Sequence, residues 1–253
     1  MKKTVKYIIK KILSRNNFQV LRLDNLVKIS NPDIERRLKI MNYYGINILF
    51  DIGANSGHYA KTIRELGYTN RIISFEPQKN AFNELYKNSL SDCNWEVNNY
   101  AIGNKNGSSI INVSENSLSS SILKMLPKHL ETAPESKYIR IEEIEIKKFD
   151  TIIRNFLKFG DRVMMKIDTQ GFEKDVLQGA ASSFINIIII QLEMSIVQLY
   201  ENETLLPEMI NYLNGKDFQL VSLENGFSDQ VTGQLLQVDG IFLNRKFQTN
   251  EVE

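Results

Sequence analysis

Residues 46–57 read Ile-Asn-Ile-Leu-Phe-Asp-Ile-Gly-Ala-Asn-Ser-Gly, an apolar run that leads directly into a turn with two glycines. The pattern predicts a strand over Ile46–Ile52 and a helix over Gly57–Leu66, which Gly67 ends. Glycines between a strand and a helix let the backbone approach a ligand closely, as in nucleotide-binding α/β folds. The turn therefore indicates a ligand site, with a purely structural turn as the alternative.

An acid, Asp51, stands at the start of this turn, and the turn lacks the G-x-G-x-x-G pattern that cradles a pyrophosphate. A carboxylate repels phosphate but suits a positively charged ligand. This combination favours S-adenosylmethionine, which carries a sulfonium and an ammonium group and no phosphate. We expect the turn to bind this cofactor through the following residues: Asp51, Gly53, Ala54, Asn55 and Gly57.

A second acid follows the next predicted strand, Arg71–Phe75, in the dipeptide Glu76-Pro77. In nucleoside-binding α/β folds an acid at this position accepts hydrogen bonds from the ribose hydroxyls. The third strand, predicted over Trp95–Ile102, carries Ala101 near its end, where adenine commonly packs. We therefore expect Glu76, Pro77 and Ala101 to complete the cofactor site, with a structural role for Ala101 as the alternative.

Strands and helices alternate along the rest of the chain. The other strands are predicted over Ser108–Ser114, Tyr138–Ile146, Val163–Ile167, Ile187–Leu192, Gln219–Leu223 and Gly240–Leu243, and the other helices over Pro32–Tyr44, Gln78–Ser89, Asp150–Lys158 (with Asp150 as its cap), Gly171–Ser183 and Leu205–Leu213. Continuous apolar runs, such as the four isoleucines at 187–190, indicate strands that are buried on both faces. The fold class is therefore α/β, a doubly wound parallel sheet with helices on both faces.

The strand over Val163–Ile167 leads into Asp168, and Glu193 ends the next strand. Because ligands of a doubly wound sheet lie beyond the carboxyl ends of its strands, both carboxylates should lie beside each other at the crevice. Such a pair can accept a hydroxyl proton or share a Mg²⁺ ion, so Asp168 and Glu193 are the candidate catalytic residues and the candidate metal ligands. The alternative is that they cap helices or orient the loop. For Glu173, the favourable position of an acid at the start of a helix is by itself a sufficient explanation.

Three stretches together resemble the FkbM family of class I S-adenosylmethionine-dependent methyltransferases: Asp-Ile-Gly-Ala-Asn-Ser-Gly at 51–57, Phe-Glu-Pro at 75–77, and Lys-Ile-Asp-Thr-Gln-Gly-Phe-Glu at 166–173 followed by Val-Leu-Gln-Gly-Ala at 176–180. The resemblance covers about Ile48 to Leu243. It implies a mostly parallel seven-stranded Rossmann-like sheet. It also implies O-methylation of a sugar, a surface polysaccharide precursor or a similar natural product. Many relatives carry Val-Glu where this chain has Thr169-Gln170.

The composition of the 253-residue chain, 42% hydrophobic and 24% charged, is typical of a globular protein and excludes wholesale disorder. One cysteine and two histidines exclude a disulfide framework and leave little for a zinc site. The longest apolar run is far shorter than the roughly 20 residues that span a bilayer. We therefore expect a cytoplasmic protein.

Basic residues concentrate at the amino end, where residues 1–45 hold 11 Lys and Arg against 3 Asp and Glu. In residues 1–15 the apolar side chains recur at helical spacing between lysines, which predicts a basic amphipathic helix. This helix either packs on the protein or lies on an anionic membrane surface. We expect two parts, a basic helical extension over 1–45 and a methyltransferase domain over 46–253.

Three other functions compete with O-methylation. A methyltransferase acting on nucleic acid is disfavoured by the acidic body, which holds 20 Lys and Arg against 27 Asp and Glu, and by the lack of an N/D-P-P-Y/F/W strand end. A nicotinamide dehydrogenase would need G-x-G-x-x-G. A non-catalytic cofactor-binding scaffold would not need the acids Asp51, Glu76 and Asp168. We expect a small-molecule or glycan acceptor and no nucleic acid, while the oligomeric state is left open. The serine-rich region Asn104–Lys137 is either a functional loop or a surface insertion.

Overall fold

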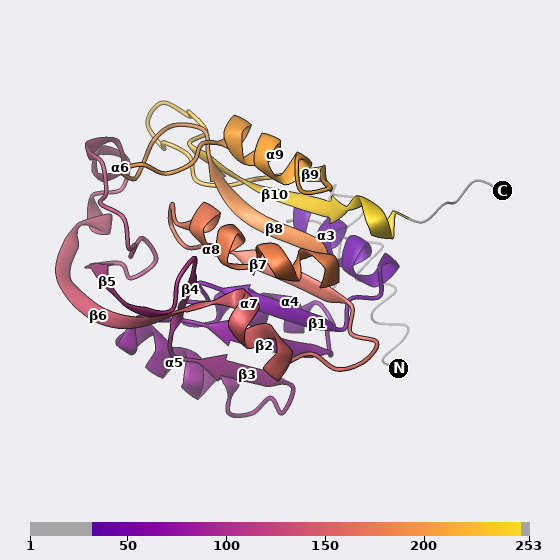
Figure 1. The fold of residues 1–253 in the computed structure, drawn as a ribbon. Helices are drawn as coiled ribbons and strands as arrows, with labels where there is room; N and C mark the ends of the chain where they lie inside the picture. Colours follow the sequence, from indigo (N-terminus) through magenta and orange to yellow (C-terminus); the bar gives the residue numbers. More distant parts are fainter. Residues whose placement is uncertain (1–31, 249–253) are drawn as a thin grey trace, which may run out of the picture. The chain divides into compact units, whose positions relative to one another are not determined.

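The computed structural model describes residues 32–248, and its centre is a seven-stranded sheet in the order β3-β2-β1-β7-β8-β10-β9 (Figure 1). Its strands are β1 (Ile48–Ile52), β2 (Arg71–Phe75), β3 (Trp95–Asn98), β7 (Val163–Ile167), β8 (Ile187–Ser195), β9 (Phe218–Asn225) and β10 (Gln237–Asn244). All neighbours pair in parallel except β10, which is antiparallel to both β8 and β9. The predicted α/β sheet, mostly parallel and seven-stranded, is confirmed.

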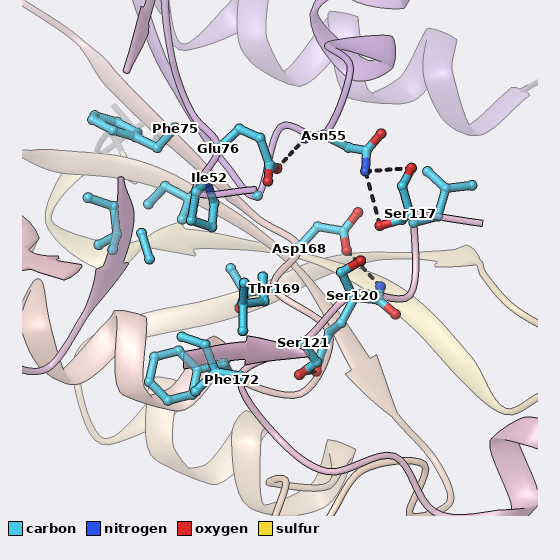
Figure 2. A pocket seen from close by; sticks show the side chains of 18 residues that line it. Ile52, Asn55, Phe75, Glu76, Ser117, Ser120, Ser121, Asp168, Thr169 and Phe172 are labelled. Atoms are coloured by element: carbon cyan, nitrogen blue, oxygen red, sulfur yellow. Dashed lines mark hydrogen bonds between the residues drawn. The ribbon is translucent and has the colours of Figure 1, made fainter. Parts of the chain in front are cut away.

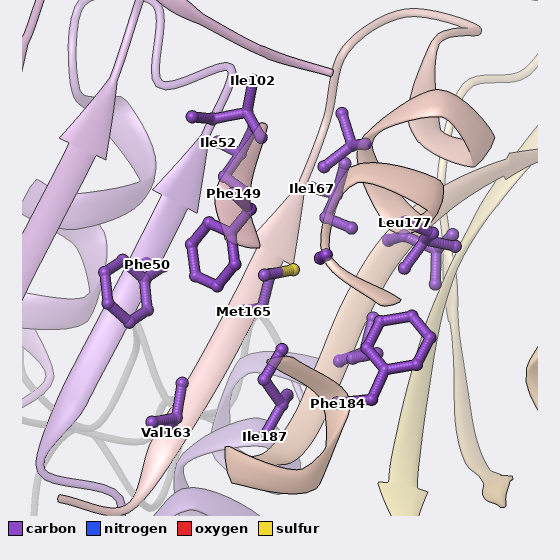
Figure 3. Close-up of a cluster of buried hydrophobic side chains, with 14 of the residues drawn as sticks. Phe50, Ile52, Ile102, Phe149, Val163, Met165, Ile167, Leu177, Phe184 and Ile187 are labelled. Atoms are coloured by element: carbon purple, nitrogen blue, oxygen red, sulfur yellow. The ribbon is translucent and has the colours of Figure 1, made fainter. Parts of the chain in front are cut away.

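The apolar runs form the central strands because helices cover both of their faces. On one face Phe50 and Met165 lie in a buried cluster with residues of α7 (Phe149–Ile152), α8 (Glu173–Gly179) and α9 (Leu206–Asn214) (Figure 3). Phe50 meets Phe149 edge-to-face at 4.9 Å between ring centroids. Each such fully buried aromatic contributes about 1.5–3 kcal/mol. On the opposite face α4 (His58–Glu65) contacts β8 through Tyr59, whose hydroxyl donates to Gln191, and α5 (Lys79–Ser89) brings Leu85 beside the start of α4.

A second, three-stranded sheet lies beside the carboxyl ends of the parallel strands (Figure 1). It consists of β4 (Ala101–Gly103), β6 (Tyr138–Lys148) and β5 (Gly107–Ser114), in that order. The prediction of a single strand over Trp95–Ile102 is therefore wrong, because this stretch forms two strands, β3 in the large sheet and β4 in the small one. The chain turns between them where the Asn99 side-chain amide donates to the backbone oxygens of Glu76 (2.9 Å) and Pro77 (3.1 Å).

Two predicted helices are shorter in the structure. The helix predicted over Asp150–Lys158 is α7 followed by a 3₁₀ turn, Ile153–Asn155. Asp150 does not cap it; instead its carboxylate accepts from the backbone N–H groups of Ser182 and Ser183. The helix predicted from Gly171 begins at Glu173, because Gly171 is a turn residue with φ +95°. It ends at Gly179 and is followed by a second 3₁₀ segment, Ala181–Asn186.

The connection from β5 to β6 holds α6 (Pro127–Thr132) and a 3₁₀ turn, Pro134–Ser136. We call residues 115–126, between β5 and α6, the serine loop. A last 3₁₀ turn, Arg245–Phe247, follows β10.

Contacts divide the chain into Met1–Ile40 and Met41–Glu253. The first unit is described only from residue 32, where α3 (Pro32–Tyr43) begins, with Arg36 paired to Asp33 at 2.9 Å. The basic helix predicted over residues 1–15 lies outside the described residues. In the part of the chain that is described, no helix has the length and apolar character needed to cross a membrane.

Candidate active site

A pocket opens where the carboxyl ends of β1, β2 and β7 meet the small sheet (Figure 2). Its walls include the turn after β1, the Glu76-Pro77 pair after β2, the turn after β7 and the serine loop. The lining residues are Ile52, Gly53, Asn55, Phe75, Glu76, Pro77, Ala101, Ile102, Ile111, Ser117, Leu118, Ser120, Ser121, Ile122, Asp168, Thr169, Gln170 and Phe172. Two sheets and one loop therefore build the pocket together.

Glu76 links two walls of this pocket. Its carboxylate accepts hydrogen bonds from the backbone N–H groups of Asn55 and Gln78, both at 2.8 Å. Burial raises the pKa of Glu76 to about 7. The Asn55 side chain donates in turn to the serine loop, to the backbone oxygen (3.2 Å) and hydroxyl (3.3 Å) of Ser117. The second acid of the sequence pattern thus faces the pocket and also orders the first turn.

Asp51 lies below the pocket rather than in its wall. Its side chain is fully buried, and Lys166 of β7 approaches it with 3.2 Å between Nζ and Oδ1. The Ser74 hydroxyl donates to the other carboxylate oxygen at 3.2 Å. Burial lowers the pKa of Lys166, but the carboxylates of Asp51 and Asp168 outweigh this and raise it above its ordinary value. Asp51 and Lys166 therefore form a buried ion pair beneath the turn.

The glycines of the turn permit close backbone packing. A Cβ at Gly53 would lie 1.8 Å from the backbone oxygen of Asp168, and a Cβ at Gly57 would lie 2.6 Å from the Trp95 ring. Both have a left-handed φ, +75° and +85°. Gly53 lines the pocket, whereas Gly57 and the buried Ala54 do not. Position 53 requires glycine because the turn after β1 touches the turn after β7 there.

The two candidate catalytic carboxylates lie together at the ends of β7 and β8. The Gln170 side-chain amide donates to Asp168 Oδ1 and to Glu193 Oε2, both at 2.9 Å. Gln237 of β10 also donates to Glu193 Oε2 at 2.8 Å. Burial, and then the negative charges of Asp168 and Asp239, raises the pKa of Glu193 well above its ordinary value. Asp168 lines the pocket, but Glu193 does not. Glu193 lies within β8, which continues to Ser195.

Glu173 shapes the turn that carries Asp168. Its Oε1 accepts hydrogen bonds from the backbone N–H groups of Thr169 (2.8 Å) and Gly171 (3.2 Å) and from the Thr169 hydroxyl (3.1 Å). Burial raises the pKa of Glu173 to about 7. The sequence explained Glu173 by its position in the first helical turn. The structure adds a second role, because its carboxylate holds the turn that carries Asp168.

Several residues of the site were not singled out from the sequence. Lys166 had a usable signal, because a lysine inside an apolar strand is rarely buried without a partner. Tyr200 is fully buried, and its ring lies against His129, with 5.2 Å between centroids. His129 is itself buried, which lowers its pKa to about 4, and it does not line the pocket. The serine loop lines the pocket with Ser117, Ser120 and Ser121, which agrees with the functional one of the two interpretations given for the region Asn104–Lys137.

The residues around Asp168 and Glu193 do not fit a metal ion. An amide N–H donor, Gln170, lies between the two carboxylates, where a cation would need oxygen ligands. Among residues 32–248, no three His, Cys, Asp or Glu side chains are grouped so that they could hold a metal. The expectation of Mg²⁺ therefore has no support in this site.

Comparison with known families decides the relationship. The profile of the methyltransferase FkbM domain matches residues 51–220, about two thirds of the chain, including all three motif regions. This chain belongs to the FkbM methyltransferase family. The resemblance inferred from the three motifs is confirmed, and membership implies methyl transfer with S-adenosylmethionine as the donor.

Solved structures give remote matches to this FkbM family member. An FkbM methyltransferase from Methylobacillus flagellatus is 15% identical, with a TM-score of 0.46 over 77% of this chain, which spans 43% of that protein's chain. A precorrin-6y C5,15-methyltransferase from Geobacter metallireducens is 13% identical over 78% and 79% of the two chains, with a TM-score of 0.39. The METTL16 methyltransferase domain is 10% identical over 84% and 67%, with a TM-score of 0.46. A comparison with curated proteins finds no match.

Proposed function

We propose that this protein transfers the methyl group of S-adenosylmethionine to a hydroxyl of a sugar, a surface polysaccharide precursor or a similar natural product. The observation that carries the proposal is the pair of carboxylates, Asp168 and Glu193, at the end of two neighbouring strands beside the pocket. An alkyl hydroxyl is a weak nucleophile until its proton is removed, and a carboxylate pair is suited to that task.

The pocket fits the methyl donor by the chemistry of its walls. Glu76 offers carboxylate oxygens to ribose hydroxyls, while Pro77 and Ala101 lie among apolar neighbours such as Phe75 and Ile102 that suit an adenine ring. When bound, S-adenosylmethionine supplies an electrophilic methyl group on a positively charged sulfur. Gly53 and Asn55 would contact it from the turn after β1. Asp51, Ala54 and Gly57 would act indirectly, by holding that turn.

Asp168 is the group that meets the acceptor. Its side chain retains 39% exposure, whereas that of Lys166 beside it retains 7%. Lys166 lies 3.5 Å from Asp168 Oδ2 and orients the carboxylate. Burial and the negative charge of Asp168 raise the pKa of Glu193, so Glu193 is the better proton acceptor at neutral pH. The amide of Gln170 holds the two acids side by side. The pair thus takes the hydroxyl proton while the walls hold the acceptor oxygen in line for displacement.

Calorimetric titration of S-adenosylmethionine and of its demethylated product tests the donor site first. Wild-type protein should bind both, and Glu76→Gln should weaken binding by about tenfold or more, since a hydrogen bond to a charged group contributes about 1.5–3 kcal/mol. The matched control is Glu143→Gln, an exposed acid on β6. Equal binding by both variants would reject Glu76 as a donor ligand. A screen of polyhydroxylated acceptors with labelled donor then tests the reaction.

A further inference from the structure

Gln170 connects its own turn, after β7, with three segments that are distant in sequence. Its amide nitrogen donates to Asp168 and Glu193, and its amide oxygen accepts from the Tyr200 hydroxyl at 2.7 Å. Its backbone oxygen accepts from the Ser121 hydroxyl of the serine loop at 2.6 Å. The side chain thus spans the gap between the turn after β7, β8, and the segment that follows β8.

The Tyr200 hydroxyl determines which way the Gln170 amide faces. A glutamine amide has one accepting end and one donating end of nearly equal size, so its orientation depends on its partners. Tyr200 donates to the oxygen, which leaves the NH₂ group for the two carboxylates. Burial raises the pKa of the Tyr200 hydroxyl well above its ordinary value, so the hydroxyl remains a donor. The ring is fully buried and cannot turn away easily.

The backbone holds Gln170 in place at some conformational cost. Its φ of +54° lies in the left-handed region, where a residue with a Cβ is less stable. The contacts that compensate are the Ser121 hydroxyl on its backbone oxygen and the Glu173 carboxylate on the N–H groups of Thr169 and Gly171. Contacts from outside the turn therefore impose this geometry.

An uncharged donor is well suited to this position. Asp168 and Glu193 are close enough to share one NH₂ group, and Asp239 and Glu173 add further negative charge around Glu193. Lys166 supplies a positive charge that lies 3.5 Å from Asp168 Oδ2 and also acts on Glu193. The amide of Gln170 gives each carboxylate one hydrogen bond without adding charge.

We propose that Tyr200 and Gln170 are positioning residues that hold Asp168 and Glu193 as one proton-accepting pair for the acceptor hydroxyl. The proposal rests on the proposed function, since it assigns these residues a part in hydroxyl methylation. Tyr200 acts through Gln170, and Gln170 acts through the two carboxylates. Neither contributes an atom to the reaction.

Tyr200→Phe tests the chain of contacts by removing a single hydroxyl while the buried ring stays. The matched control is Tyr68→Phe, because Tyr68 is also buried and its hydroxyl also donates to a backbone oxygen, that of Arg71 at 3.3 Å, away from the pocket and from Gln170. Loss of one neutral hydrogen bond corresponds to about a three- to tenfold change. We expect Tyr200→Phe to lower kcat by that factor with the KM for the donor unchanged, and Tyr68→Phe to alter neither.

Gln170→Met gives a second variant, which removes both amide groups without adding charge. We expect kcat to fall further than in Tyr200→Phe, with donor binding retained, because each carboxylate loses one hydrogen bond. A kcat in Gln170→Met at or above that of Tyr200→Phe would overturn the role assigned to the NH₂ group.

A measurement on the protein without acceptor separates this proposal from the proposed function. The side-chain amide signal of Gln170 in a ¹H–¹⁵N NMR spectrum is assigned by its loss in Gln170→Met. We expect the signal to exchange slowly with water in the wild type and in Tyr68→Phe, and faster in Tyr200→Phe. If no hydroxyl acceptor is methylated, the proposed function fails while this result still decides the contact. Unchanged amide exchange in Tyr200→Phe, or equal kcat in both tyrosine variants, would overturn the positioning role.

Discussion

The strand ends of the large sheet and the serine loop beside the small sheet form facing walls of one pocket, but they are built differently. The strand ends carry the charges of the site: Asp51, Glu76, Lys166, Asp168 and Glu193. They are held by the parallel register, in which Asp51 pairs with both Ser74 and Lys166. The serine loop presents hydroxyl groups and the exposed Leu118, and side-chain hydrogen bonds across the pocket hold it.

Because of this difference, we expect the strand ends to carry the reacting groups and the serine loop to influence ligand binding. Groups that need fixed charge and geometry lie on strands whose neighbours cannot shift without disrupting the core. The serine loop is held mainly by neutral hydrogen bonds, each with a net contribution of about 0.5–1.5 kcal/mol. Changes at the strand ends should therefore abolish the reaction or the fold, whereas changes in the serine loop should adjust binding.

The largest effect is expected at Asp168. Asp168→Asn keeps the size of the side chain and removes its capacity to accept a proton, so methyl transfer should fall by about 10²–10⁴-fold with donor binding retained. Single-turnover assays with labelled donor measure the fall. The control is Asp217→Asn, because Asp217 is exposed and its φ of +66° is one that Asn tolerates well. Methyl transfer at the wild-type rate in Asp168→Asn would contradict the assignment of the reacting group to the strand ends.

The next effect concerns the contact between the turns after β1 and β7. Gly53→Ala places a Cβ 1.8 Å from the backbone oxygen of Asp168, so we expect about 2–4 kcal/mol loss of stability and loss of donor binding. Gly233→Ala has nearly the same φ, +74° against +75°, and no atom within 4 Å of the added Cβ. Urea denaturation compares the two. Equal destabilisation would show that backbone conformation alone, and not the close approach, requires glycine at position 53.

A smaller effect is expected in the pH dependence of stability. The folded pKa of Glu173 is about 7, above the ordinary value of 4.5, so the folded state binds more protons between these values. This group therefore makes the protein less stable as the pH rises from about 4.5 to 7. Glu173→Gln should remove this loss of stability between pH 4.5 and 7. Each kcal/mol of stability corresponds to roughly 2–4 °C in Tm for a domain of this size. Thermal melts of both proteins from pH 4.5 to 8 measure this, and parallel profiles would contradict the assignment.

The smallest effect is expected in the serine loop. Ser121→Ala removes the hydroxyl that donates to the backbone oxygen of Gln170, and we expect donor affinity to fall by about two- to tenfold. Hydrogen exchange of residues 115–126 should quicken in the same variant. The control is Ser108→Ala, an exposed serine on β5. A loss of donor affinity as large as that in Gly53→Ala would show that the serine loop is as important to the pocket as the strand ends.

Local pattern was sufficient for the large sheet because each central strand is a continuous apolar run. Asp51 is the second-last residue of β1, and Glu76 and Asp168 directly follow β2 and β7, so the order of strands alone brings these acids to one edge. The break between β3 and β4 was missed, since it depends on the Asn99 side chain reaching backbone oxygens more than 20 residues away. Helix ends at Asp150 and Gly171 were also misplaced, because contacts outside each helix decide them.

The sequence by itself determined the α/β sheet, the family and the acids that follow its strands, because strand periodicity and short motifs are local properties. Only the tertiary structure decided what those acids do. It paired Asp51 with Lys166 beneath the pocket, placed the Gln170 amide between Asp168 and Glu193, and brought Tyr200 to that amide from 30 residues away. Hydrogen bonds between distant side chains depend on how the strands and loops pack together, and no local pattern encodes that arrangement.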